Sequence, residues 1–313
     1  SGDFPTVESP NPEVPSAMAM AIAKAKEVEA DLILASDPDA DRIGCVLRDD
    51  NGEYVLINGN QIVMILLNYI MTRNKELGRI TGKEYIVKTI VTTETIKSIA
   101  DQNGFKMYDC YTGFKWIAAV IRDNEGVGRY LGGGEESYGF LAEDFCRDKD
   151  AVSAISLMAE ALAWAKTKGM NFLQMLQDIY IKYGYSREAG VSLVRKGKSG
   201  AEEIIAIMKE FRANPPKQIA GSDVVIVKDY ADLNMKNLKT GEVTKMDMPT
   251  TSNVLQYFTE DGTKISIRPS GTEPKIKFYV EVKGSMKTNA DYADANNKAD
   301  AKIEAVKKDL GID

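Results

Sequence analysis

The feature that most constrains this chain is an acidic loop at residues 37–42, Asp-Pro-Asp-Ala-Asp-Arg, which directly follows an apolar run at residues 31–35. An apolar run bounded by turn residues predicts a buried strand. Carboxylates that follow such a strand lie at its carboxyl end, where open α/β sheets bind their ligands. Clustered carboxylate oxygens suit Mg²⁺ or Ca²⁺, and Mg²⁺ that is only partly coordinated by protein leaves positions for a phosphate oxygen. The loop therefore predicts a hard-cation site at Asp37, Asp39 and Asp41.

The same loop admits other interpretations. An EF-hand needs Gly at its sixth position and Glu at its twelfth, but Arg42 and Arg48 stand there, so this interpretation is set aside. A strand followed by Asp-x-Asp is also typical of haloacid-dehalogenase-like phosphotransferases, in which Asp37 would be the nucleophile. A third possibility is an acidic surface turn between two strands. The loop alone does not decide among them.

Two further segments contain residue types suited to binding a ligand. Residues 132–139 are Gly-rich and acidic, and residues 268–275 read Arg-Pro-Ser-Gly-Thr-Glu-Pro-Lys between two strand-like runs. The second segment has the composition of a phosphate cradle: Arg makes bidentate contacts to oxygen, Ser and Thr supply hydroxyls, and Gly lets backbone N–H groups approach. It is not a Walker loop, because the Gly-Lys-Ser/Thr ending is absent and no helical pattern follows.

In this order and at domain-sized separations, the three segments resemble the α-D-phosphohexomutases, the phosphoglucomutase/phosphomannomutase superfamily. Residues 37–42 resemble its metal loop, residues 134–139 its sugar-recognition loop and residues 268–272 its phosphate loop. The resemblance extends over essentially the whole chain. It implies an enzyme that interconverts hexose 1-phosphate and hexose 6-phosphate through a phosphoserine and a 1,6-bisphosphate, with Mg²⁺ as cofactor and glucose 1,6-bisphosphate as activator.

The resemblance also implies roles for single residues. The metal loop would hold Mg²⁺ against the phosphoserine, and Arg42 would assist at the same phosphate. Hydrogen bonds to sugar hydroxyls would come from Glu135 and Ser137, and the segment around Thr112 and Gly113 would lie near the sugar. The phosphate that is not transferred would be bound by residues of the phosphate loop: Arg268, Ser270, Gly271 and Thr272. Lys277 would help from the next strand.

The general acid/base is expected among the lysines and carboxylates, because the chain has no histidine. A lysine surrounded by other cations would have a lowered pKa suited to proton transfer. Lys149, in the Arg-Asp-Lys-Asp segment at residues 147–150, resembles the family's lysine at the equivalent place. Lys88 and Lys115 are the alternatives.

The family's nucleophile is missing from this sequence. Family members carry a first domain with a loop of the type Thr-x-Ser-His-Asn-Pro, whose serine is phosphorylated, and nothing here matches it. The chain also begins with Ser1-Gly2 rather than Met. We therefore expect a fragment that lacks the N-terminal phosphoserine domain and is inactive alone. A non-catalytic sugar-phosphate-binding module is the remaining alternative.

Composition narrows the setting of the protein. A net charge of −6 gives no electrostatic attraction to nucleic acid. Cys45, Cys110 and Cys146 are odd in number and form no close pair, which argues against a disulfide framework and favours a reducing cytoplasm. The most apolar run, residues 62–70, is far shorter than the ~20 residues that a membrane-spanning helix needs. No membrane or nucleic-acid partner is therefore expected.

The order of predicted elements indicates an α/β fold in three parts. Residues 1–56 are expected to be the C-terminal part of an α/β sandwich domain, domain II of the family, which carries the metal loop. Residues 57–185 alternate strands and helices, as a second α/β sandwich, domain III, would. Residues 186–313 read as a smaller α+β domain, domain IV, with a tight hairpin at Asp261-Gly262. A hinge is expected in a loop after Tyr185.

Overall fold

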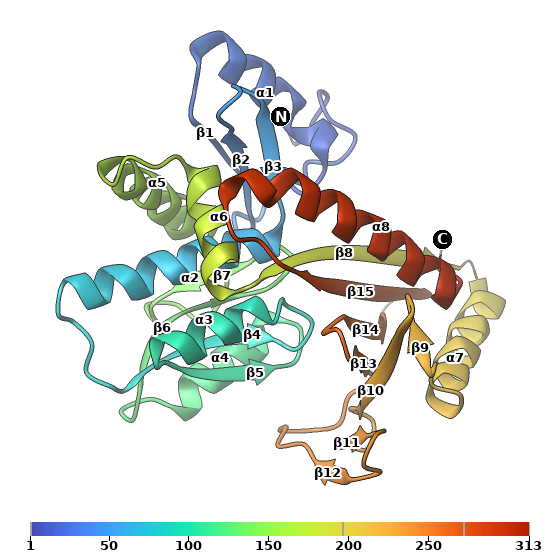
Figure 1. Cartoon of the computed structure of the whole chain (residues 1–313). Helices are drawn as coiled ribbons and strands as arrows, with labels where there is room; N and C mark the ends of the chain where they lie inside the picture. Colours follow the sequence, from blue (N-terminus) through green and yellow to red (C-terminus); the bar gives the residue numbers. More distant parts are fainter. Residues whose placement is uncertain (1, 196, 272, 313) are drawn as a thin grey trace. The chain divides into compact units, whose positions relative to one another are not determined.

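The computed structural model describes residues 2–195, 197–271 and 273–312, with the backbone alone at Lys198. The described chain forms two compact units, Ser1–Gly184 and Tyr185–Asp313. Figure 1 shows the order of their helices and strands. The domain limits at 56/57 and 185/186 stay predictions.

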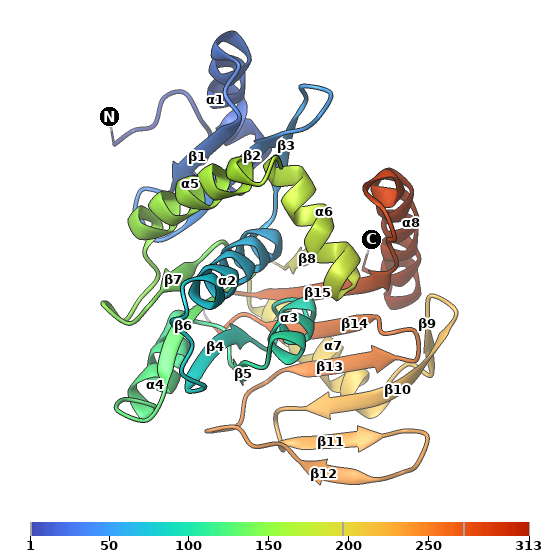
Figure 2. The ribbon, with the colours of Figure 1, turned by 60° about the vertical axis from the view of Figure 1, so that its left-hand side comes forward.

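The first unit contains an antiparallel sheet of β1 (Leu32–Ser36), β2 (Ile43–Arg48) and β3 (Tyr54–Ile57), with β2 in the middle. Because side chains alternate along a strand, Ile33 and its partner Val46 share one face. Helix α1 (Pro15–Val28) packs against that face through Met18 and Ala25. Figure 2 shows α5 (Ala151–Thr167) on the side of the sheet away from α1. The acidic loop joins β1 to β2.

A second sheet in the same unit has the order β5-β4-β6-β7. Strand β4 (Glu84–Thr89) runs parallel to β5 (Lys106–Cys110) and β6 (Arg129–Gly134), whereas β7 (Phe140–Ala142) is antiparallel to β6.

Helices cover both faces of this second sheet. Helix α4 (Phe114–Asp123) packs its buried Ile117 and Ile121 against one face. On β6, a side chain at Gly132 would contact Leu67 and Ile70, so α2 (Gly59–Glu76) covers the opposite face. The remaining helices of the unit are α3 (Thr95–Asn103) and α6 (Phe172–Tyr183). The result is an α/β/α sandwich, as the alternation in the sequence predicts.

The second unit is built on one antiparallel sheet of order β12-β11-β10-β13-β14-β15-β8, with β9 paired to β10. It also contains helices α7 and α8 and the short 3-10 helix η1. The bounds are β8 (Tyr185–Val194), α7 (Gly197–Ala213), β9 (Gln218–Ile219), β10 (Ser222–Asp229), β11 (Asn234–Asn237), β12 (Val243–Lys245), β13 (Leu255–Thr259), β14 (Lys264–Pro269), β15 (Lys275–Gly284), η1 (Asn289–Asp291) and α8 (Tyr292–Leu310).

Both long helices of the second unit pack on the same face of its sheet. Phe211 of α7 lies against Phe278 of β15, with ring centroids 5.9 Å apart. Asp300 of α8 pairs with Arg187, whose register partner on β15 is Val282. Phe278 and Val282 share a face because side chains alternate along a strand. Among the described residues of this unit, the opposite face is free of helices and carries polar side chains that include Ser266, Lys277 and Glu281.

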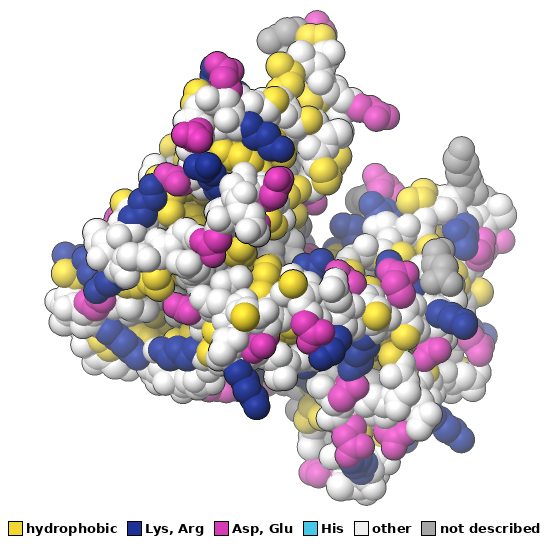
Figure 3. Space-filling model, turned by 45° about the horizontal axis from the view of Figure 1, so that its top comes forward, with side chains coloured by type: hydrophobic (Ala, Val, Ile, Leu, Met, Phe, Trp, Pro, Cys, Tyr) yellow, Lys and Arg dark blue, Asp and Glu magenta, His cyan; other side chains and the backbone are white. Residues whose placement is uncertain are grey.

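The α/β and α+β classes and most of the predicted helices and strands are confirmed. The loop predicted after Tyr185 is wrong, since β8 begins at Tyr185 and pairs with β15 over its whole length. The sequence pattern does not predict helix α7 or strands β7, β8, β9, β11 and β12. Among the described residues, no helix is long and apolar enough to cross a membrane. On the face drawn in Figure 3, basic and acidic side chains are interspersed.

Candidate functional site

The acidic loop is closed on itself by hydrogen bonds. The Oδ1 atom of Asp37 accepts the backbone N–H groups of Asp41 and Arg42, both at 3.1 Å. Ala40 adopts a left-handed conformation with φ of 58°. One oxygen of Asp37 therefore holds the acidic loop in shape.

Asp41 reaches the loop that precedes α5. Its Oδ2 atom lies 3.0 Å from Nζ of Lys149. Its Oδ1 atom is buried and has no hydrogen-bond partner among the described residues. The backbone N–H of Ala151 donates to the carbonyl of Ala40 at 3.0 Å. The acidic loop and the Lys149 segment are therefore joined through backbone and side chain.

Lys149 has a raised pKa rather than the lowered pKa that the sequence suggested. Burial lowers the pKa of Lys149, but the carboxylates of Asp41 and Asp148 outweigh burial and raise it above its ordinary value. The expectation assumed neighbouring cations, whereas the two ion-pair partners are anions. The assignment of Lys149 as the acid/base stays a prediction.

The sugar-recognition loop connects β6 to β7 and lies against the acidic loop. Arg42 forms an isolated β-bridge with Gly139, and the N–H of Ile43 donates to the carbonyl of Tyr138 at 3.0 Å. Glu135 is buried, and its Oε1 accepts the N–H of Gly113 at 2.7 Å. The predicted residues Gly113, Glu135, Arg42 and Asp41 are thus brought together from three separate parts of the chain.

Gly139 lets the side chain of Lys149 pass. A Cβ atom at Gly139 would lie 2.2 Å from Cδ of Lys149 and 3.5 Å from Oε2 of Glu135. The aliphatic stem of Lys149 and the carboxylate of Glu135 therefore flank the same point on the sugar-recognition loop. Thr112 and Ser137 are half-buried nearby in sequence.

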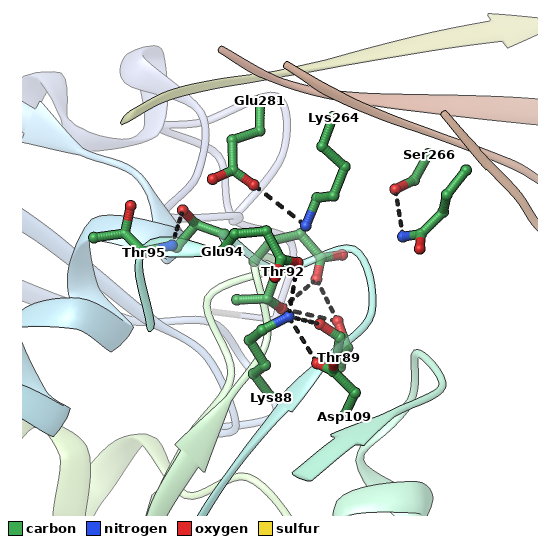
Figure 4. Close-up of polar contacts among 12 residues, drawn as sticks. Lys88, Thr89, Thr92, Glu94, Thr95, Asp109, Lys264, Ser266 and Glu281 are labelled. Atoms are coloured by element: carbon green, nitrogen blue, oxygen red, sulfur yellow. Dashed lines mark hydrogen bonds and ion pairs between the residues drawn. The ribbon is translucent and has the colours of Figure 1, made fainter. Parts of the chain in front are cut away.

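Lys88 and Lys115, the two alternative acid/base candidates, lie in surroundings that differ from those of Lys149. Lys88 is fully buried, and its Nζ pairs with Asp109 at 2.7 Å and Glu94 at 3.1 Å (Figure 4). Burial lowers the pKa of Lys88, but Asp109 and Glu94 together raise it well above its ordinary value. Lys115 is exposed, with Nζ 5.4 Å from the ring centroid of Trp116. Full burial between two carboxylates disfavours Lys88 as a proton carrier.

Glu136 belongs to the site region, and the sequence alone gave it no role. Its Oε2 accepts the hydroxyls of Thr89 and Thr92 at 3.2 Å and 3.3 Å. Burial and the neighbouring Glu135 raise the pKa of Glu136. Its carbonyl oxygen lies 2.1 Å from where a Cβ of Gly59 would stand, so α2 begins directly behind the loop. The signal in the sequence is two threonines three residues apart, Thr89 at the end of β4 and Thr92 beyond it, which only folding brings to Glu136.

The acidic loop has the donor chemistry of a hard-cation site. Three carboxylates lie within the loop, and Asp41 offers one buried oxygen without a hydrogen-bond partner. These features fit a hard cation. The described side chains, however, contain no group of three Asp, Glu, His or Cys arranged to hold a metal ion. Arg42 is directed toward Glu13, with Nη1 3.0 Å from Oε1. The ligand set Asp37, Asp39 and Asp41 stays a prediction.

The phosphate loop belongs to the second unit, between β14 and β15. Arg268 and Lys277 are direct register partners across these strands. They lie on the helix-free face, because Lys277 alternates with Phe278. Ser270 donates its N–H to the carbonyl of Lys275 at 2.7 Å, and Gly271 is exposed with open space around it. The predicted residue Thr272 lies outside the described part of the chain.

Comparison with known proteins agrees with this arrangement. Residues 1–52, 58–183 and 225–299 match, respectively, domain II, domain III and the C-terminal domain of the phosphoglucomutase/phosphomannomutase family. A phosphoglucomutase of Staphylococcus aureus (strain MRSA252) is 38% identical over 281 residues, covering 90% of this chain and 50% of that protein. One of Staphylococcus haemolyticus (strain JCSC1435) is 36% identical over 282 residues, with the same coverage.

Solved structures show the same fold. Parafusin, a phosphoglucomutase from Paramecium in its open form, aligns with 96% of this chain and 50% of its own, with a TM-score of 0.59 and 16% identity. A phosphoglucomutase/phosphomannomutase family protein from Burkholderia thailandensis aligns with 98% of this chain and 53% of its own, with a TM-score of 0.60 and 19% identity.

The three domain matches follow one another in sequence order, and the fold carries the three loops where these domains place them. Together they assign the chain to a family. It belongs to the phosphoglucomutase/phosphomannomutase family, within the α-D-phosphohexomutase superfamily. The chain spans about half the length of the curated relatives that it matches.

Proposed function

We propose that the protein to which this chain belongs is a phosphohexomutase that interconverts hexose 1-phosphate and hexose 6-phosphate. One observation carries the proposal: Asp41, Lys149 and the sugar-recognition loop are joined by the Asp41–Lys149 ion pair and the Arg42–Gly139 bridge, although they are far apart in sequence. An acidic loop, a cation and a hydroxyl-binding carboxylate side by side are what phosphoryl transfer to a sugar hydroxyl requires.

In this proposal Asp37, Asp39 and Asp41 would hold Mg²⁺, which supplies positive charge to the phosphoryl group in transfer when it is bound. The donor chemistry of the loop and the oxygen of Asp41 that lacks a hydrogen-bond partner among the described residues support this assignment. Glucose 1,6-bisphosphate would act as intermediate and activator.

Substrate contacts follow from the two other loops. Glu135, whose Oε1 is held by Gly113, would accept hydrogen bonds from sugar hydroxyls, and Ser137 and Thr112 would add hydroxyl contacts. Arg268 and Lys277 would bind the phosphate that is not transferred, together with the loop between them (Ser270, Gly271 and Thr272). Two cations opposite each other on one sheet face support anion binding there.

Lys149 would move a proton at the sugar hydroxyl, and Arg42 would contact the phosphate of the phosphoserine. The serine nucleophile would belong to a further domain of the whole protein, which the half-length match to relatives supports. We also propose a cytoplasmic setting, which is supported by the three free cysteines Cys45, Cys110 and Cys146.

The test is conversion of glucose 1-phosphate to glucose 6-phosphate, with Mg²⁺ and glucose 1,6-bisphosphate present. The whole protein and the 313-residue chain are compared, each with its Asp39→Ala variant. We expect turnover by the whole protein, its loss in the variant and none by the chain alone. Turnover by the chain that Asp39→Ala abolishes would place the nucleophile within these residues and contradict the proposed division of roles. No turnover by the whole protein would overturn the function.

A further inference from the structure

We propose that Lys149 is a built-in counter-cation of Asp41, and that Asp41 must release Lys149 before it can bind a divalent ion. Metal loading of the acidic loop and release of the Lys149 amino group would then be one coupled event. The inference rests on the proposed metal role of the loop.

The two oxygens of Asp41 are in different situations. Oδ2 is taken by Nζ of Lys149 at 3.0 Å, whereas Oδ1 is buried without a hydrogen-bond partner and lies 3.9 Å from Nε of Arg42. A divalent ion on Oδ1 would bring two positive charges beside the ammonium group of Lys149. The ion and the ammonium group would repel each other strongly, because water is partly excluded around Asp41. The same carboxylate therefore cannot serve both cations equally well.

The position of Lys149 is fixed by the fold rather than by the ion pair alone. Its stem passes over Gly139, where a Cβ would lie 2.2 Å from Cδ, and its Nζ lies 5.7 Å from the ring centroid of Phe114. The side chain is only 16% exposed. Arg147, two residues earlier, pairs instead with Glu125 and is more exposed. Only the amino end of Lys149 needs to move for Asp41 to become available.

The released amino group keeps one carboxylate partner, Asp148 at 3.2 Å from Nζ, and has a second carboxylate, Glu135, nearby. Oε2 of Glu135 and Cδ of Lys149 both lie within 4 Å of the point where a Cβ of Gly139 would stand. When Lys149 leaves Asp41, the carboxylate of Glu135 is therefore within reach of its flexible end. Metal loading would then place a cation at the sugar-recognition loop, so that the metal loop and the sugar loop are prepared together.

The experiment measures Mg²⁺ affinity of the chain by isothermal titration calorimetry, with Mn²⁺ binding by electron paramagnetic resonance as a second probe. The variant is Lys149→Met, which keeps the apolar stem and removes the charge. Arg147→Gln is the matched control, because it removes one positive charge two residues away that pairs with Glu125 and not with Asp41. We expect Lys149→Met to bind either ion roughly three- to tenfold more tightly, the range that a partly buried ion pair is worth. Arg147→Gln should bind as the wild type does.

The outcomes separate this inference from the proposed function. Equal affinity in Lys149→Met and wild type, or an equal gain in Arg147→Gln, would overturn the coupling and leave the metal loop intact. Weaker binding in Lys149→Met would also overturn it, since Lys149 would then support the metal. If neither the wild type nor Lys149→Met binds either ion, the metal assignment itself fails, and the coupling fails with it.

Discussion

In the first unit Asp41 pairs with Lys149 and Arg42 with Glu13, whereas in the second unit Arg268 and Lys277 lie directly opposite each other on neighbouring strands. Among the described residues, neither Arg268 nor Lys277 forms an ion pair with a carboxylate. The acidic loop thus carries its own counter-charges and the basic loop does not. Like charges opposite each other destabilise a sheet, so the basic loop is arranged to gain from binding an anion, whereas Asp41 of the acidic loop already holds a cation.

The two loops also differ in how closely the surrounding chain approaches. The sugar-recognition loop beside the acidic loop leaves no room for a Cβ at Gly59 or Gly139. The phosphate loop is open, with nothing within 4 Å of a Cβ at Gly271. A crowded, charge-paired site is therefore held in one shape, and an open, unpaired one is held mainly by its flanking strands. Glycine and charge substitutions should separate the two.

The largest effect is expected for Gly59→Ala. Its Cβ would meet the backbone carbonyl oxygen of Glu136 at 2.1 Å and the backbone nitrogen of Tyr138 at 2.7 Å. Backbone atoms cannot move aside cheaply, so we expect a loss of about 3 kcal/mol in the free energy of unfolding. Gly271→Ala, in open space, should change it by less than about 0.5 kcal/mol. Urea denaturation measures both, and similar losses in the two variants would remove the contrast in crowding.

A smaller loss is expected for Gly139→Ala. Its Cβ would clash with the stem of Lys149, which is flexible and can be displaced. We expect a cost of about 1 kcal/mol in the free energy of unfolding, from strain and from the weakened pair with Asp41. In the Lys149→Ala background the side-chain atoms that meet the new Cβ are absent, so adding Gly139→Ala should lower the free energy of unfolding much less. A cost that is unchanged in that background would show that the crowding does not come from Lys149.

Lys277→Gln should act in opposite directions on stability and on anion binding. Without ligand, removal of one of two opposed cations should raise the free energy of unfolding by about 0.5 kcal/mol. Binding of inorganic phosphate, followed by calorimetry, should weaken. Lys283→Gln is the matched control on the same strand, because Lys283 pairs with Glu281 at 2.5 Å and should gain no stability on losing its charge. A stability gain in the control alone would contradict the picture of an unpaired basic loop.

The smallest effect is expected for Glu136→Gln and depends on pH. Burial and Glu135 raise the pKa of Glu136 in the folded chain. A raised folded pKa means that the wild type keeps its full relative stability below the ordinary value and loses it as pH rises through the folded value. The variant does not titrate, so its stability relative to wild type should increase from pH 4 to pH 7 in urea denaturation. A difference that is independent of pH would show that Glu136 is not destabilised by its charge.

Much of the fold follows from local pattern. Alternating apolar runs and helical periodicity predict α1, the β2–β3 hairpin and the β4–α3–β5–α4–β6 order, because these elements bury one clear face. Strand β8 was missed, since its exposed and half-buried residues give no apolar run and only pairing with β15 makes it a strand. The buried run in α2 predicts a helix, but not that its whole first half is enclosed.

The candidate site was predictable in its loops but not in its connections. Motif resemblance selects Asp41, Glu135 and Arg268, because each segment has a composition suited to one ligand group. The pairing of Asp41 with Lys149 could not be derived from spacing, because it depends on how α5 is placed beside β1. The sign of the pKa shift of Lys149 was wrong for the same reason: the sequence does not say which charges will be its neighbours.

Binding of glucose 6-phosphate to the chain by isothermal titration calorimetry tests the central claim most directly, that these loops form sugar-phosphate-binding machinery. The account predicts binding by the wild type and losses of roughly tenfold or more in affinity for both Glu135→Gln and Arg268→Gln, since each removes a charged hydrogen-bonding group. The Gly271→Ala variant should remain folded and serves as the control for stability. Wild-type affinity in both charge variants, or no binding by the wild type, would contradict the account.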